Sequence, residues 1–191
     1  MQRNTVYIVS GLPRSGTSMM MKILTDGGLE TLVDNNRKAD NDNPKGYFEY
    51  KPSMKLHKDN SWMGKALGKV VKIMVNFTEF LPDEYNYKII LMRRDLDEIL
   101  ASQQIMLKEE DKKVDDAVRK IFTRDVEKAK KIADEKENIE MLEVWYPEVV
   151  KNPGHEVERI YCFLGLDLDK EEMLEAVDPS LYRNRRGAIQ R

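Results

Sequence analysis

The sequence predicts an α/β fold in which a parallel β-sheet of four to five strands is flanked by helices on both faces. Short runs rich in β-branched and apolar residues alternate along the chain with longer segments of helical periodicity. Parallel strands need crossover connections, so this alternation favours a parallel sheet covered on both sides. No internal repeat or low-complexity linker breaks the pattern, and we expect a single domain over residues 1–191.

The first predicted element is a buried strand, followed at once by a turn and a helix. The run Thr-Val-Tyr-Ile-Val-Ser-Gly over residues 5–11 is apolar, β-branched and closed by a glycine. Good helix formers fill the middle of residues 15–28, and the glycines at positions 27 and 28 are a helix stop signal. Strand, tight loop and helix are therefore expected in that order.

Three more strands are expected, over residues 69–75, 88–92 and 140–146, because each run is short, apolar and rich in β-branched residues. The third of the four strands runs directly into Arg93. Residues 34–52 are rich in Asn, Asp, Lys, Gly and Pro without a sustained period, and they are expected to form a long loop. A loop of that length is usually functional or disordered.

The remaining helices are predicted from the spacing of apolar residues. One follows the third strand, and the residues expected to share a face of it are Leu96, Ile99, Leu100 and Leu107. A second helical pattern runs from residue 114 to 132 through a heavily charged segment, which we interpret as a solvated helix face. Shorter helices are expected over residues 153–164 and 169–177.

Composition and charge exclude several classes of protein. Lysine and arginine number 32 against 34 aspartates and glutamates, so the net charge of -2 creates no general field that would attract nucleic acid. No apolar run approaches the roughly 20 residues of a membrane span, and no signal peptide is recognised, so we expect a cytoplasmic protein. Cys162 is the sole cysteine, which excludes an internal disulfide. With two histidines in the chain, a metal site would consist mostly of carboxylates.

The most informative motif is Gly11-Leu-Pro-Arg-Ser-Gly16-Thr-Ser18, which lies between the first strand and the first helix. Its glycines have the G-x-x-x-x-G spacing of a phosphate-binding loop, so the predicted sheet is of the P-loop type. In such a loop, backbone N–H groups and the helix N-terminus point into one concavity and bind an anion. Glycine is required where a Cβ would block the ligand.

Two departures from ATP-binding P-loop proteins narrow the range of possible ligands. Thr17 stands where a lysine would reach the β- and γ-phosphates, and Arg14 supplies a cation instead. Arg93 and Arg94 follow the third strand, where P-loop kinases commonly place a metal-binding aspartate. Arginine binds phosphate and repels Mg²⁺. The pattern predicts a ligand with two separated anionic groups, held without a metal.

The loop resembles the 5′-phosphosulfate loop of the sulfotransferases that use 3′-phosphoadenosine 5′-phosphosulfate (PAPS). The resemblance implies that the 5′-phosphate is surrounded by Pro13, Arg14, Ser15, Gly16, Thr17 and Ser18. It also implies sulfuryl transfer from PAPS to a hydroxyl or amine acceptor, with 3′-phosphoadenosine 5′-phosphate (PAP) as product and no metal. The acceptor would be a small molecule or a carbohydrate.

Two further motifs resemble the same family in the same order along the chain. Arg94 and Ser102 match, at the family spacing, the arginine and serine that bind the 3′-phosphate. Arg185, Arg186 and Gly187 resemble the basic-glycine motif that closes over that phosphate near the C-terminus. The segment from Tyr146 to Gly165 also looks like the family's strand-then-helix segment.

The general base does not follow from the resemblance. Cytosolic members carry a catalytic histidine after the strand that corresponds to residues 69–75, and the matching stretch Lys72-Ile-Met74 has none. Asn43-Pro-Lys-Gly-Tyr-Phe-Glu49 looks like a segment of smaller bacterial-type members that carries a candidate basic glutamate. We therefore take Glu49 as the first candidate, because the preceding Tyr-Phe would partly desolvate it.

His57 is the competing base, and Asp42 is a more remote third candidate. Arg14 is expected to stabilise the leaving phosphate electrostatically, since an arginine does not donate its proton, and Lys72 is a weaker second cation. Two rival functions stay open at this level. A P-loop kinase of a nucleotide or small metabolite would need Mg²⁺ and ATP, and a non-catalytic nucleotide-binding module would keep the anion sites without a base.

Overall fold

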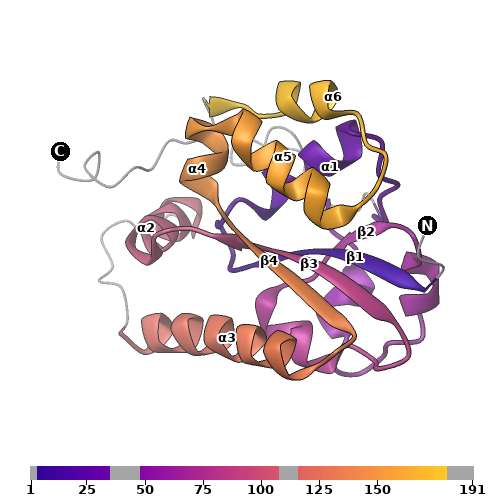
Figure 1. The fold of residues 1–191 in the computed structure, drawn as a ribbon. Helices are drawn as coiled ribbons and strands as arrows, with labels where there is room; N and C mark the ends of the chain where they lie inside the picture. The colour runs from indigo at the N-terminus through magenta and orange to yellow at the C-terminus, as the bar shows by residue number, and fades with distance from the viewer. Residues whose placement is uncertain (1–3, 35–47, 108–115, 180–191) are drawn as a thin grey trace, which may run out of the picture.

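The computed structural model describes residues 4–34, 48–107 and 116–179, which form a layered α/β structure around one parallel sheet (Figure 1). The strand order is β2-β1-β3-β4. The strands are β1 (Thr5–Gly11), β2 (Val70–Lys72), β3 (Asn86–Arg93) and β4 (Ile139–Trp145). The predicted parallel sheet is confirmed, with four strands among the described residues.

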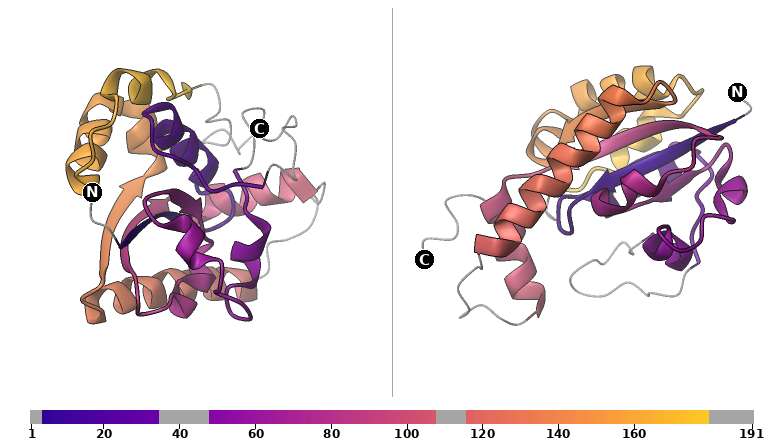
Figure 2. Two further views of the ribbon diagram at one scale, coloured as in Figure 1. Left: turned by 90° about the vertical axis from the view of Figure 1, so that its right-hand side faces the viewer. Right: turned by 90° about the horizontal axis from the view of Figure 1, so that it is seen from below.

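Helices cover both faces of the sheet, as predicted (Figures 1 and 2). One face is covered by α1 (Thr17–Asp26), α4 (Tyr146–Lys151), α5 (Pro153–Leu164) and α6 (Lys170–Glu175). The other is covered by α3 (Asp116–Glu135) and the 3₁₀ helices η1 (Lys51–Lys55), η2 (Met63–Ala66) and η3 (Val75–Phe80). Helix α2 (Leu96–Leu107) lies where the strands end.

The alternation of side chains along β1 explains why both faces are covered. Tyr7 and Val9 belong to the apolar cluster beneath α1 and α5, whereas Val6 and Ile8 belong to the cluster on the opposite face. Every residue of β1 is buried. A central parallel strand with both faces buried is expected to be continuously apolar, and Thr5–Gly11 nearly is.

The register brings the carboxyl ends of three strands to one edge. Val9 of β1 pairs with Lys72 of β2, and Gly11 pairs with Met92 of β3. The chain places β2 on one side of β1 and β3 on the other, so the direction of the crossovers reverses at β1. In open α/β sheets, ligands bind outside the carboxyl ends of the strands at such a switch point.

Three sequence predictions differ from the structure in detail. The fourth strand ends at Trp145, and Tyr146 already begins α4, because Pro147 occupies the first turn of that helix. Leu107, predicted to share a face with Ile99 and Leu100, is 53% exposed whereas those two are buried, since only the first part of α2 packs on the sheet. The predicted loop over residues 34–52 gives way to η1 at Lys51. Residues 35–47 of it lie outside the described structure.

Candidate functional site

The loop between β1 and α1 makes a tight turn at the switch point. The backbone N–H and the hydroxyl of Ser15 both donate to the carbonyl of Leu12, at 3.2 and 2.7 Å. Gly16 is the N-cap of α1, with φ 99°, and its carbonyl accepts from the N–H of Met20. Arg14 has φ 68°, a conformation that is costly for a residue with a Cβ. We call residues 11–18 the first loop.

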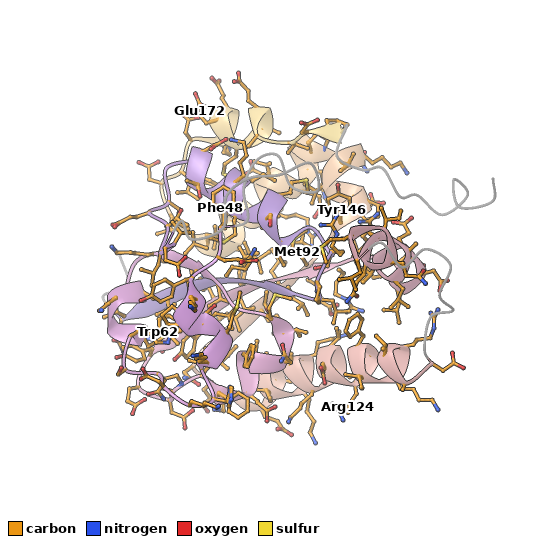
Figure 3. All side chains as sticks on the ribbon, turned by 180° about the vertical axis from the view of Figure 1, so that it is seen from behind. Phe48, Trp62, Met92, Arg124, Tyr146 and Glu172 are labelled. Carbon is orange, nitrogen blue, oxygen red and sulfur yellow. The ribbon has the colours of Figure 1, made fainter. Side chains whose placement is uncertain are left out.

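Both glycines of the first loop are required because neighbouring atoms leave no room for a Cβ at either position. A Cβ on Gly16 would lie 2.3 Å from a ring carbon of Tyr146, at the start of α4. A Cβ on Gly11 would lie 2.5 Å from the Ser15 hydroxyl and 2.9 Å from the carbonyl of Met92. Figure 3 shows Tyr146 and Met92 on the side of the molecule where α2 lies. The first loop is therefore closely packed against β3 and α4.

The side chain of Arg14 joins the first loop to α2. Its Nε donates to the hydroxyl of Ser102 at 2.9 Å, and its Nη1 lies 4.0 Å from the sulfur of Met106. Ser102 is 2% exposed and sits on the buried face of α2. The structure thus brings together the arginine expected at the 5′-phosphate and the serine expected at the 3′-phosphate.

Arg94 lies in the connection from β3 to α2 and contacts the first loop directly. Its Nη1 donates to the backbone carbonyl of Arg14 at 3.2 Å, and its Nε donates to the carboxylate of Glu98 at 2.9 Å. The guanidinium carbon lies 5.0 Å from the ring centroid of Tyr146. Both side chains of the Arg94–Glu98 ion pair are almost fully buried.

Lys72 brings a further cation to this edge from the end of β2. Its Nζ lies 3.4 Å from the hydroxyl of Ser18, in the first turn of α1, and the residue is 8% exposed. Arg14, Lys72 and Arg94 therefore meet at the carboxyl edge of the sheet, beside the N-terminus of α1. Positive side chains with little exposure to water, beside a helix N-terminus, favour the binding of an anion, because water screens them little.

Glu49 is held near the carboxyl end of β2. The bridge between Thr31 and Val70 is parallel, so the chain after Thr31 runs beside β2 toward that end. The N–H of Asp34 donates to the carbonyl of Glu49 at 3.1 Å. The hydroxyl of Ser53 donates to the carbonyl of Lys72 at 3.0 Å and so holds η1 at the same place. Glu49 thus lies on a segment that packs at the end of β2 where Lys72 is found.

His57 packs against η3 and not against the first loop. Its exposed ring stacks on Phe77 at 5.7 Å and lies 5.8 Å from Phe80, measured between ring centroids. Four other predicted site residues lie outside the part of the chain that the structure describes: Asp42, Arg185, Arg186 and Gly187. Pro13 and Thr17 lie in the first loop and at the first position of α1, as their motif predicts.

Sequence reasoning missed two residues that shape this site. Tyr146 packs against Gly16 and Arg94, and nothing in its local sequence signals contacts so far along the chain. Glu98 pairs with Arg94, and here a signal exists, because residues four apart on a helix are neighbours. A cavity of about 220 Å³ also borders Arg94 and is lined by Arg93, Phe122 and Trp145 among others.

Within residues 4–34, 48–107 and 116–179, no three histidine, cysteine or acidic side chains are grouped so that they could hold a metal ion. The helices in the same ranges include none that is long and apolar enough to cross a membrane.

Comparison with known proteins finds a similarity to one family. The model of a sulfotransferase family matches residues 79–170, a span that contains Arg94, Ser102 and Tyr146. Over these residues, just under half of its length, the chain is similar to the sulfotransferase family. No curated protein sequence matches it. The similarity to this family therefore concerns residues 79–170.

Two solved sulfotransferases share the fold. The sulfotransferase domain of the olefin synthase from Synechococcus PCC 7002 is 15% identical, with a TM-score of 0.54 over 98% of this chain and 83% of that one. Mouse sulfotransferase SULT7A1, solved in complex with PAP, is 16% identical, with a TM-score of 0.57 over 95% of this chain and 67% of that one. At these identities the similarity concerns the fold alone.

Proposed function

We propose that this protein is a sulfotransferase that transfers a sulfuryl group from PAPS to a hydroxyl or amine of a small-molecule or carbohydrate acceptor. The observation that carries the proposal is the meeting of the first loop with Arg94 and Ser102 at the switch point. The first loop and the Arg94–Ser102 region, each proposed to bind an anion, lie side by side there, and PAP carries two separated phosphates. The PAP complex of mouse SULT7A1, which shares the fold, supports the same class of nucleotide.

In the proposed reaction, an acceptor oxygen or nitrogen attacks the sulfur in line, and the bond from sulfur to the bridging oxygen of the phosphate breaks. Negative charge accumulates on that oxygen as PAP leaves. Arg14 is the residue proposed to stabilise this charge, aided by the backbone N–H groups at the start of α1. Lys72, beside Ser18, supplies a second positive charge.

Glu49 is the proposed general base that removes the acceptor's proton. Its segment packs at the end of β2 that carries Lys72, whereas the ring of His57 packs against Phe77 and Phe80. A base must come within hydrogen-bond reach of the attacking group, so position favours Glu49.

Calorimetry on the purified chain tests the nucleotide. PAP should bind without Mg²⁺, and ATP should bind more weakly whether or not Mg²⁺ is present, because position 17 lacks the lysine of ATP-binding loops. Binding of ATP only with Mg²⁺, and no binding of PAP, would instead identify a kinase. PAP release from PAPS in the presence of a panel of phenols, amines and sugars then separates an enzyme from a non-catalytic module.

Single substitutions test which residue is the general base. Glu49→Gln should lower turnover by about 10²-fold and leave PAP affinity unchanged, since loss of a general base typically costs that much. His57→Asn serves as the comparison and should stay within about threefold of the wild-type rate. The reverse ranking of the two variants would assign the base to His57.

A further inference from the structure

Glu98 is a buried negative charge beside a site proposed to bind two phosphates. Its side chain is 4% exposed and lies in the first turn of α2. By its charge alone, this carboxylate would repel an anion bound nearby and weaken the site. Its carboxylate accepts from the Nε of Arg94 at 2.9 Å, so it acts directly on that arginine.

The other edge of the Arg94 guanidinium reaches the first loop. Nη1 donates to the backbone carbonyl of Arg14 at 3.2 Å. Arg14 is held at φ 68°, a left-handed conformation that an unsupported arginine rarely adopts. A hydrogen bond that fixes the direction of this carbonyl therefore favours the loop conformation in which it is observed. The support comes from a side chain 80 positions along the sequence.

The guanidinium of Arg94 is fixed on its face as well as on its edge. The ring of Tyr146 lies 5.0 Å from it and also fills the space beside Gly16. A planar guanidinium held by a carboxylate at Nε and by a ring on one face has little freedom to turn. Glu98 binds Nε while Nη1 binds the loop, so the carboxylate restrains rotation of the guanidinium in its plane.

We propose that Glu98 is a positioning residue for the first loop, acting through Arg94. It orients the guanidinium so that Nη1 holds the Arg14 carbonyl, and it thereby makes the 5′-phosphate loop dependent on the residue predicted to bind the 3′-phosphate. The ligand-binding part of this inference rests on the proposed function. The ordering of the loop does not, and it is testable without any nucleotide.

The neighbouring ion pair provides a matched control. Arg93 precedes Arg94 in the chain and pairs with Glu143 of β4, and its guanidinium lies 5.3 Å from the ring centroid of Trp145. The two pairs share an arginine, a carboxylate and an aromatic ring at the same end of β3. The side chains of Arg93 and Glu143 are 21% and 34% exposed, and the hydrogen bonds of Arg93 include none to the first loop.

Hydrogen exchange of the ligand-free protein is the first test. In Glu98→Ala, amides of residues 11–18 should exchange about tenfold faster, while those of β3 keep their wild-type rates, because only the local opening becomes easier. Glu98→Gln should restore slow exchange to within about threefold, since its amide oxygen accepts from Nε. Glu143→Ala should match the wild type. Unchanged loop exchange in Glu98→Ala, or an equal increase in β3, would overturn the proposal.

Binding of adenosine 5′-phosphate is the second test, measured well below the unfolding temperature. Glu98→Ala should bind it about tenfold more weakly, which corresponds to the loss of one charge-assisted contact in the loop support. If Glu98 acted through its charge alone, removal of that charge would strengthen binding. Unchanged or tighter binding by folded Glu98→Ala therefore contradicts the proposal. Failure of the wild type to bind any adenosine phosphate would contradict the proposed function and leave the exchange test decisive.

Arg94→Lys keeps the proposal testable if Glu98→Ala does not fold. Lysine retains the positive charge but lacks the planar fork that joins Glu98 to the Arg14 carbonyl. Exchange over residues 11–18 should again rise about tenfold, with β3 unaffected. Wild-type loop exchange in folded Arg94→Lys would show that the fork does not support the loop.

Discussion

Two strands of the sheet pass into helices at the same edge in different ways. Between β1 and α1 the chain makes the first loop, in which Gly11, Arg14 and Gly16 all have positive φ. Between β4 and α4 there is no loop, because Trp145 ends the strand and Tyr146 begins the helix with Pro147 behind it. The direct connection shows that this fold can join strand to helix without strain.

This difference shows that strained backbone conformations are concentrated in the first loop. A left-handed non-glycine residue and two sterically required glycines occur together in the first loop, where the backbone is bent around the N-terminus of α1. Such conformations persist only when neighbouring structure supports them, and they concentrate at functional sites. At the β4 junction, Tyr146 provides that support by packing against Gly16. The simple junction therefore stabilises the strained one.

The largest effect is expected from Gly16→Ala, which would disrupt this contact. The added Cβ would lie 2.3 Å from a carbon of the Tyr146 ring. The alanine would also have to adopt φ 99°, which is unfavourable for a residue with a Cβ. We expect a loss of about 2–4 kcal/mol in the free energy of unfolding, as for an overpacked position with backbone strain. PAP binding should fall below detection by calorimetry.

Gly28→Ala is the matched control for that variant. Gly28 has φ 95°, yet a Cβ there would have no heavy atom within 4 Å. Its cost should be limited to backbone strain, about 1–2 kcal/mol, with PAP affinity unchanged. Equal losses in chemical denaturation of the two variants would mean that the Tyr146 contact contributes nothing.

An intermediate effect is expected when one side chain is removed at each junction. Arg14→Ala should lower turnover by about 10²–10³-fold through loss of electrostatic stabilisation of the leaving phosphate. Trp145→Ala removes a side chain that is 45% exposed, and its rate should stay within about threefold of the wild type. Steady-state release of PAP from PAPS measures both. A comparable loss in Trp145→Ala would place the β4 junction in the reaction as well.

The smallest effect is expected from Ser102→Ala. A single hydroxyl contact is worth about 1 kcal/mol, so PAP affinity should fall about fivefold. Affinity for adenosine 5′-phosphate should fall less than PAP affinity, because that nucleotide lacks the 3′-phosphate proposed to bind Ser102 and is affected only through the contact of Ser102 with Arg14. An equal loss for both nucleotides in parallel titrations would remove the assignment of Ser102 to the 3′-phosphate.

The parts of this structure that local sequence determines were predictable. The strand Thr5–Gly11, the loop after it and the parallel sheet follow from apolar runs, glycine spacing and helical periodicity. The meeting of Arg14 with Ser102 follows only in part, since the motif indicates their roles and not that their side chains bond. The predicted single domain over residues 1–191 and the roles of Glu49 and Lys72 stay predictions.

Contacts between distant segments were not predictable from pattern alone. The exposure of Leu107 did not follow from the sequence, because periodicity shows which residues share a face and not where the sheet beneath that face ends. The 3₁₀ helices η1 to η3 are too short to leave a periodic signal. The support of the first loop by Arg94 and Tyr146 depends on tertiary packing across most of the chain.

The contact between Gly16 and Tyr146 has a consequence for biosynthesis. The ring that supports the glycine turn is encoded about 130 positions later, so a ribosome exposes the whole first loop, which is proposed to bind phosphate, long before its partner has been made. A nascent chain that ends before Tyr146 contains every residue of the loop but lacks the packing that shapes it. Nucleotide capture by the growing polypeptide should therefore begin only after the α4 segment has left the exit tunnel.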